Sequence, residues 1–316
     1  MRYETVIAFA FFATATSLYG QSRVLMWENK PTPQQVGMLR WYEAITGVTF
    51  PVGDSPVAVG FDGTDIWVAN CASDNITRLR ASDGGLVGTY AGGDCPYSIA
   101  FDGANIWAPN AGSDKVIKLR ARDGSLVGSY PVGHNPVGIA FDGANVWVAN
   151  LDSSNVTRLR ASDGGLVGTY PVNSPASIAF DGVHVWVTNL ASDTVTKLRA
   201  GDGSLVGSYA VGDRPFAIAF DGSYIWVVNN LSDTVTKLNA WDGGHVGTYP
   251  VGHNPAGIVF DGRNVWVTNS AGVTKLRAGD GSLVGNYATS SSARGLAFDG
   301  ANVWMTHWSS DSVTKM

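Results

Sequence analysis

The residues best suited to bind or transform a ligand stand where a repeated pattern breaks. In the last copy of a repeat, Arg294 follows Ala293, whereas the other six copies have proline followed by an uncharged residue. The same copy then has His307 and Trp308 where the others have asparagine and a non-aromatic residue. An arginine fork can hold a carboxylate or phosphate by two hydrogen bonds, and a tryptophan supplies an aromatic wall. The alternative is that this copy is irregular only because it completes the fold.

The repeat that frames these residues is Phe-Asp-Gly followed by tryptophan, and its copies lie 38 to 40 residues apart. The seven triplets begin at Phe61, Phe101, Phe141, Phe180, Phe220, Phe260 and Phe298. A regular period of this length indicates one supersecondary unit copied along the chain. The third copy divides into four short strands, called a to d, at residues 137–141, 146–150, 155–160 and 166–170. The sequence therefore predicts an all-β fold, a seven-bladed propeller of four-stranded antiparallel blades.

The two ends of the chain complement each other. The last copy stops after its third strand, at residues 312–316, and the segment 44–50 matches an isolated fourth strand. An open ring would leave unpaired strand edges. We therefore expect the N-terminal strand to pair with residues 313–315 and to complete the last blade.

One face of such a propeller carries the loops between strands d and a and between b and c. The sequence varies most there, whereas the turns of the other face repeat Phe-Asp-Gly and Asp-Gly-Gly or Asp-Gly-Ser. Variation on one face is expected of a binding surface, although neutral drift in loops predicts some of it too. The candidate binding residues on this face are Tyr97, His134, Asn135, Asp213, Arg214, Phe216, His253, Asn254, Arg294, His307 and Trp308.

Most repeated residues have a structural interpretation. The aromatic residues are expected to pack between blades, and the Asp-Gly pairs to form tight turns. Lysines and arginines ending the third strands, among them Arg158, Arg160, Lys197 and Arg199, are expected to pair with turn aspartates on a solvated rim. The asparagines ending the second strands are expected to cap turns through backbone N–H groups, the alternative being a polar ring at the channel mouth.

The domain organisation follows from the N-terminus. Residues 1–20 resemble a secretory signal peptide, with an apolar run behind Arg2 and cleavage after Ala15 or Gly20. The alternative is an uncleaved membrane anchor. Residues 21–43 are expected to form a linker and residues 44–316 the propeller. We expect a secreted, periplasmic or cell-surface protein without a membrane span after signal cleavage.

Two cysteines, Cys71 and Cys95, fit an exported protein and are predicted to form a disulfide between the first two blades. Both fall on the face of the d–a and b–c loops, in adjacent blades. The alternative is a pair of buried thiols.

Composition excludes several classes of function. A formal net charge of −5 with scattered basic residues argues against nucleic acid as a partner. His134 and His253 lie three blades apart, too far to share one metal ion, and no triad or glutamate pair has a catalytic spacing. We expect no cofactor, no metal and no catalytic residue. A monomer that binds an unknown protein, peptide or glycan is the favoured interpretation.

The motifs Val-Gly-x-x-Pro before strand a and Val-Trp-Val-Thr-Asn at strand b, as at residues 251–255 and 265–269, resemble those of YVTN-repeat propellers. Tryptophan here replaces the tyrosine of the family motif. The resemblance covers about residues 44 to 316. It implies a seven-bladed, often exported protein, in most cases without established catalytic activity.

The scaffold is also similar to streptogramin B (virginiamycin B) lyase, which implies a histidine after the strand-a proline, a glutamate past strand b, and magnesium. No histidine follows a proline here and no glutamate follows strand b. A metal-dependent lyase-like or lactonase-like enzyme acting in the central channel is therefore the alternative function.

Overall fold

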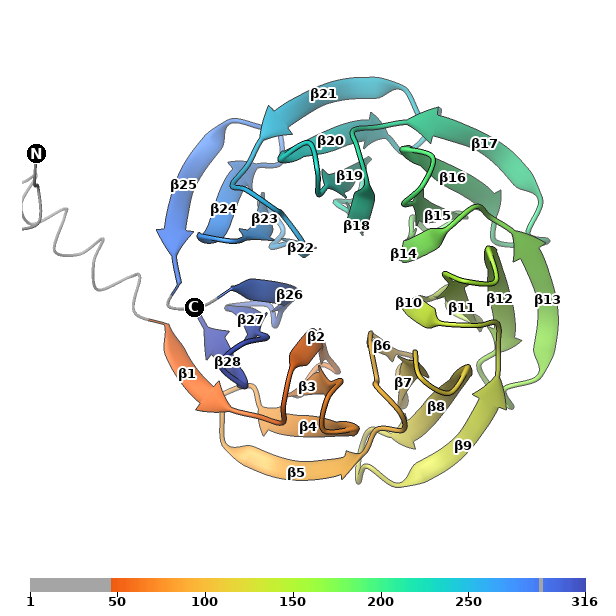
Figure 1. The fold of residues 1–316 in the computed structure, drawn as a ribbon, viewed down its shortest axis with the longest axis vertical. Coiled ribbons are helices and arrows are strands. Elements are labelled where there is room, and N and C mark those ends of the chain that lie inside the picture. Colours follow the sequence, from red (N-terminus) through yellow and green to blue (C-terminus); the bar gives the residue numbers. More distant parts are fainter. Residues whose placement is uncertain (1–46, 290–291) are drawn as a thin grey trace, which may run out of the picture. The chain divides into compact units, whose positions relative to one another are not determined.

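The computed structural model describes residues 47–289 and 292–316, and these form seven four-stranded antiparallel sheets arranged as blades around an axis (Figure 1). Within the described residues there is no helix, and hence none that crosses a membrane. The predicted signal peptide and linker lie outside the described residues. The predicted fold class is confirmed.

Each blade runs from an innermost strand a to an outermost strand d. The innermost strands are β2 (Pro56–Phe61), β6 (Ala100–Phe101), β10 (Pro136–Phe141), β14 (Pro175–Phe180), β18 (Pro215–Phe220), β22 (Ile258–Phe260) and β26 (Ala293–Phe298). The second strands are β3 (Asp65–Asn70), β7 (Asn105–Asn110), β11 (Asn145–Asn150), β15 (His184–Asn189), β19 (Tyr224–Asn229), β23 (Asn264–Asn269) and β27 (Val303–His307). The third strands are β4 (Asn75–Arg80), β8 (Lys115–Arg120), β12 (Asn155–Arg160), β16 (Thr194–Arg199), β20 (Thr234–Asn239), β24 (Gly272–Arg277) and β28 (Ser312–Lys315). The outermost strands are β5 (Leu86–Ala91), β9 (Leu126–Pro131), β13 (Leu166–Pro171), β17 (Leu205–Ala210), β21 (His245–Pro250), β25 (Leu283–Ala288) and β1 (Val48–Pro51).

Ring closure is confirmed. The last blade has the strand order β1-β28-β27-β26, and β1 pairs antiparallel with β28, Phe50 opposite Val313. Phe50 also stacks on Trp304 with ring centroids 5.7 Å apart. In the other six blades a strand-d tyrosine makes this contact with the blade tryptophan, at 5.3 to 5.6 Å. The N-terminal strand therefore supplies both the hydrogen bonds and the aromatic packing of a regular strand d.

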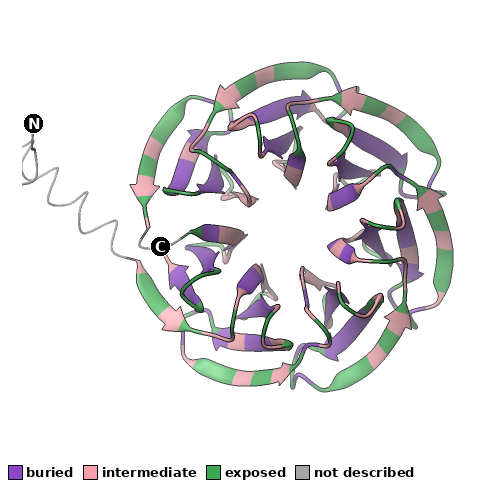
Figure 2. Cartoon of the chain, viewed as in Figure 1, coloured by how far each residue is buried: buried purple, intermediate pink, exposed green. Residues whose placement is uncertain are grey.

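The apolar core is divided among the junctions between blades. At the junction of the second and third blades, Trp107 and Val116 pack against Val146, Val148 and Leu159. Figure 2 shows this distribution, with the middle strands buried and the outer strands largely exposed. Each blade thus depends on its neighbours to cover its apolar surface.

The repeated aspartate binds the repeated tryptophan. In all seven copies one carboxylate oxygen accepts a hydrogen bond from the tryptophan Nε1–H five residues later, at 2.7 to 2.8 Å. In the third copy, the other oxygen of Asp142 accepts the backbone N–H groups of Ala144 and Asn145. Gly143 occupies the turn with φ of 98°, a conformation that favours glycine. One carboxylate therefore fixes both the a–b turn and the tryptophan ring.

The basic residues of the third strands divide into two groups. Arg160 and Arg199 pair with the turn aspartates Asp163 and Asp202, as predicted. The prediction for Lys197 is wrong, because its side chain is buried and its ammonium lies 4.7 Å from the Trp186 ring centroid.

The Lys197 ammonium donates to the carbonyls of Ala240 and Trp241 in the next blade. Arg158 is likewise not paired with an aspartate: it lies over Trp147 and donates to the Gly201 carbonyl of the next blade. These cations join neighbouring blades through backbone carbonyls. They therefore do not belong to the predicted solvated rim.

We predict that Asp142→Asn lowers the free energy of unfolding by about 2 kcal/mol, because an amide presents only one acceptor oxygen and a charge-assisted bond is lost. Urea unfolding at pH 7 measures this. Asp152→Asn, an exposed aspartate of the same blade whose carboxylate accepts no hydrogen bond from the described residues, is the control and should change stability by less than about 0.5 kcal/mol. Equal effects of the two substitutions would contradict the role assigned to Asp142.

The same variant carries a pH signature. Burial raises the pKa of Asp142, but bonds from Trp147 and the backbone lower it further, leaving that pKa below its ordinary value. A carboxyl whose pKa is lower in the folded state stabilises the fold above its unfolded pKa of about 3.9 and loses this effect as pH falls. The stability deficit of Asp142→Asn should therefore shrink when unfolding is measured below about pH 4. A deficit that stays constant into acid would contradict it.

Candidate binding site

The two faces of the ring are defined by contacts between loops. In each of the first six blades, the b–c turn bonds to the d–a loop of the same blade, as Leu151 N–H does to the Asn135 carbonyl. In the same six blades, the c–d turn bonds to the a–b turn, as Ala161 N–H does to the Ala144 carbonyl. We call the first set the variable face and the second the constant face. As expected, the d–a and b–c loops lie together on one face, and the a–b and c–d turns lie together on the other.

The loops of the variable face hold their side chains on a fixed backbone. Asn135, Arg214 and Asn254 all adopt positive φ, between 50° and 53°. The N–H of Arg214 donates to a carboxylate oxygen of Asp193, which lies in the b–c turn of the preceding blade, at 2.8 Å. The equivalent bonds of Asn135 and Asn254 are 3.0 and 2.9 Å. These loops therefore differ in side chain but share a conformation, as a binding surface on a rigid support requires.

The two histidines of this face are exposed and paired with aspartates. His134 Nδ1 lies 2.6 Å from Asp114 Oδ2, and His253 Nδ1 lies 2.7 Å from Asp233 Oδ2. The His134 bond, followed by the backbone N–H of Asn135, holds the pKa of the Asp114 carboxyl below its usual value. Nowhere in residues 47–289 and 292–316 do three or more histidine, cysteine or acidic side chains gather closely enough to hold a metal ion.

Four of the predicted residues meet where the innermost strands approach the axis. The guanidinium carbon of Arg294 lies 4.5 Å from the Trp308 ring centroid, 5.2 Å from that of Tyr97 and 6.0 Å from that of Phe216. Arg294 and Trp308 come from the seventh blade, Tyr97 from the second and Phe216 from the fifth. We call these four residues the central cluster.

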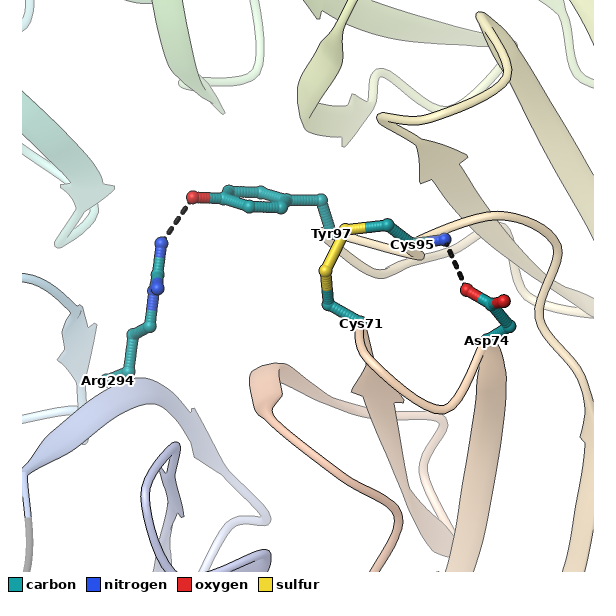
Figure 3. Close-up of a disulfide and its surroundings, with 5 residues drawn as sticks. All are labelled: Cys71, Asp74, Cys95, Tyr97 and Arg294. Atoms are coloured by element: carbon teal, nitrogen blue, oxygen red, sulfur yellow. Dashed lines mark hydrogen bonds between the residues drawn. A yellow bond between two sulfur atoms is a disulfide. The ribbon is translucent and has the colours of Figure 1, made fainter.

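Within the central cluster, Arg294 donates a hydrogen bond from one terminal nitrogen to the Tyr97 hydroxyl (Figure 3). No acidic side chain of the described residues lies within 4.0 Å of its guanidinium. The side chain is partly buried, and Trp308 is 50% exposed beside it. The cluster therefore presents an uncompensated positive charge between aromatic walls.

The local sequence explains how Tyr97 reaches this position. Pro109 of β7 accepts the Tyr97 N–H but has no N–H to return, and β6 contains only Ala100 and Phe101. Two residues before Tyr97, Cys95 is joined to Cys71 of the first blade by the predicted disulfide. Figure 3 shows Tyr97 extending from this loop toward Arg294. The disulfide replaces part of the missing strand pairing as the anchor of the loop.

His307 does not belong to the exposed surface. Its side chain is 2% exposed and Nε2 lies 2.7 Å from the Thr314 hydroxyl of β28. Its assignment to the binding face was wrong because the end of strand b turns into the blade.

The asparagines at the equivalent positions are also buried, which excludes the polar ring at the channel mouth. Asn150 donates to Asn155 and Thr157 side chains of strand c. Backbone capping, the favoured expectation, occurs only at Asn269, whose side-chain oxygen accepts the Ala271 N–H. It is wrong at the other five positions, because there the side-chain oxygen accepts no hydrogen bond from the described residues.

A second feature of the variable face is a shallow groove of about 450 Å³ over the third, fourth and fifth blades. It is lined by Leu151, Ser174, Leu190, Ala191, Asp193, Asp213, Arg214 and Leu231. Asp213 and Arg214 belong to this groove, His134 and Asn135 to the third blade, and His253 and Asn254 to the sixth. The leucines were not predicted as binding residues. Leu151 and Leu190 directly follow the last asparagine of strand b, and Leu231 stands one residue further on.

Comparison with solved structures agrees with the fold. The chain is similar to a structure of Kuenenia stuttgartiensis hydrazine synthase, with a TM-score of 0.73 and 19% identity over 86% of this chain and 98% of that one. It is similar to streptogramin B lyase, with a TM-score of 0.72 and 19% identity over 85% of this chain and 95% of that one. No protein-family model matches the chain, and no curated protein does either. At this identity the likeness shows the propeller fold alone.

We predict that replacing Cys71 and Cys95 together by serine lowers the free energy of unfolding by about 3 kcal/mol, because the disulfide closes a loop of about two dozen residues in the unfolded chain. Chemical unfolding with and without a reducing agent measures this. The wild type should lose the same stability on reduction, and the serine variant should not respond. A wild type indifferent to reduction would contradict the prediction.

Proposed function

We propose that this chain is a secreted, non-enzymatic propeller of the YVTN type that binds a protein, peptide or glycan on its variable face. The observation that carries the proposal is the central cluster, where Arg294 has aromatic neighbours from three blades and no acidic partner among the described residues. Arginine, tryptophan and tyrosine are the residues most enriched where binding energy concentrates. The groove beside Arg214 extends the surface available to a partner.

Secretion is supported by the disulfide between Cys71 and Cys95 together with the N-terminal sequence. Disulfides persist mainly in oxidising compartments outside the cytoplasm. The apolar run behind Arg2 is typical of an export signal.

A second candidate is a lyase-like or lactonase-like metal-dependent enzyme in the central channel, favoured by the fold shared with streptogramin B lyase. The positions that resemble the active-site histidine positions of that family hold other residues here, among them Tyr97, Phe216 and Arg294. The residues after strand b, such as Cys71, Leu151 and Trp308, include no glutamate. The binding function is therefore the better supported of the two.

We predict that the labelled full-length protein binds members of a peptide and glycan array, and that Arg294→Gln with Trp308→Ala weakens this binding about tenfold or more. The matched control is Arg263→Gln with Trp241→Ala, an exposed pair on the constant face, which should bind as the wild type does. If ligands are found and the two double variants bind them equally, the site is misplaced.

Thermal unfolding with and without a chelator separates the two candidate functions. A binding propeller that needs no metal should show the same midpoint in both conditions, and metal analysis of the purified protein should find no stoichiometric divalent ion. A midpoint that falls on chelation and recovers with magnesium would favour the enzyme and contradict the proposal.

A further inference from the structure

We infer that the central cluster recognises a carboxylate whose neighbouring group is apolar, as at the end of a peptide with an aromatic last residue. The inference rests on the proposed function and names the ligand chemistry of the same site. Three properties of the cluster support it: the hydrogen-bond donors, the positive charge and the aromatic side chains around that charge.

The donors of Arg294 are mostly uncommitted. A guanidinium carries five N–H groups in a rigid plane. Among the described residues, one of its nitrogens bonds to a side chain, the Tyr97 hydroxyl. That hydroxyl accepts from Arg294, so its own hydrogen remains to be donated. Arg294 and Tyr97 together therefore offer the convergent donors that a two-oxygen acceptor such as a carboxylate uses.

The charge of the central cluster favours a monoanion. Arg294 supplies its only positive charge, since the other three members are aromatic. A carboxylate would neutralise this charge, whereas a phosphate dianion would leave a net negative charge in a partly buried place. The formal charge of the whole chain, −5, gives no further attraction for a dianion.

The walls of the cluster favour an apolar neighbour to the carboxylate. Trp308 is half exposed, and Tyr97 and Phe216 are only partly buried. Their ring surfaces would lose contact with water against an apolar or aromatic group. A hydrophilic acid would meet the same guanidinium without this gain.

The test uses two probes of nearly the same size and shape, N-acetylphenylalanine with a carboxylate and N-acetylphenylalaninamide with a neutral amide in its place, titrated into the full-length protein by calorimetry. The acid should bind about tenfold or more tightly than the amide, because the amide lacks the charge-assisted bonds to Arg294. Acetate has a carboxylate but no large apolar group, so it tests the contribution of the aromatic walls and should bind weakest. Equal binding of acid and amide, or no binding of the acid, would overturn the inference.

Two further arms identify the source of the carboxylate. A peptide ending in phenylalanine should bind at least as well as N-acetylphenylalanine if the ligand is a chain end. Weaker binding of the peptide assigns the site to a small aromatic acid, which keeps the proposed chemistry. Tighter binding of inorganic phosphate or galacturonate than of N-acetylphenylalanine would overturn it.

Variants place the probe in the cluster. Arg294→Lys keeps the charge but loses the fork and should weaken binding of the acid severalfold, and Tyr97→Phe should do so by a similar factor. Arg263→Lys on the constant face is the control and should have no effect. Probe binding that none of these variants changes would show a site elsewhere and overturn the inference.

The two proposals fail differently. If the array ligands need Arg294 and Trp308 but the acid and amide bind alike, the binding face stands and the carboxylate chemistry falls. If neither the array nor the probes detect binding at the variable face, both fall.

Discussion

The hydrogen bond between each repeated aspartate and its tryptophan is the interaction on which the ring depends. It fixes the a–b turn and the indole plane together, and the indole then packs on the strand-d aromatic of its own blade and on a cation of strand c. Cations such as Lys197 lie by this indole and donate to carbonyls of the next blade, so the same arrangement also links neighbouring blades. Burial in this network also explains the pKa of Lys197, which is lowered by desolvation against the attraction of Asp181. Copies of one local arrangement thus recur in all seven blades and connect each blade to the next.

Because these repeated contacts hold the blades together, the side chains of the variable face can differ from blade to blade. The d–a loops have a common backbone conformation because turn carboxylates of the preceding blades, such as Asp193, bond to their N–H groups. Side chains such as Arg214 and His253 can therefore change without altering the blades. At the axis, the loop before β6 and the innermost strands β18 and β26 bring Tyr97, Phe216 and Arg294 close together although they are far apart in sequence. A propeller therefore makes residues that are far apart in sequence neighbours at its axis.

The fold was largely predictable from sequence, because the period, the turn residues and the complementary chain ends each leave a local signal. The Cys71–Cys95 disulfide followed from placing both residues on one face. The direction of side chains at strand ends was harder to predict from the sequence. His307 and Lys197 are polar and were predicted to be exposed. Each is instead buried and bonded to a partner that the sequence does not reveal, Thr314 for His307 and the Ala240 carbonyl for Lys197. The same limit hid the aspartate–tryptophan bond, since a constant spacing of five residues does not reveal which atoms meet. Tyr97, Phe216 and Trp308 were proposed because each departs from the repeat, and the structure brings all three rings near Arg294.

On the proposed function, Arg294 is an accessible cation at a binding surface and does not merely fill the channel. Modification with an arginine-selective dicarbonyl reagent, read residue by residue by mass spectrometry, tests this most directly. In the free protein Arg294 should react, and N-acetylphenylalanine should protect it while Arg263 on the constant face reacts at an unchanged rate. An Arg294 whose reactivity is the same with and without the probe would contradict the account.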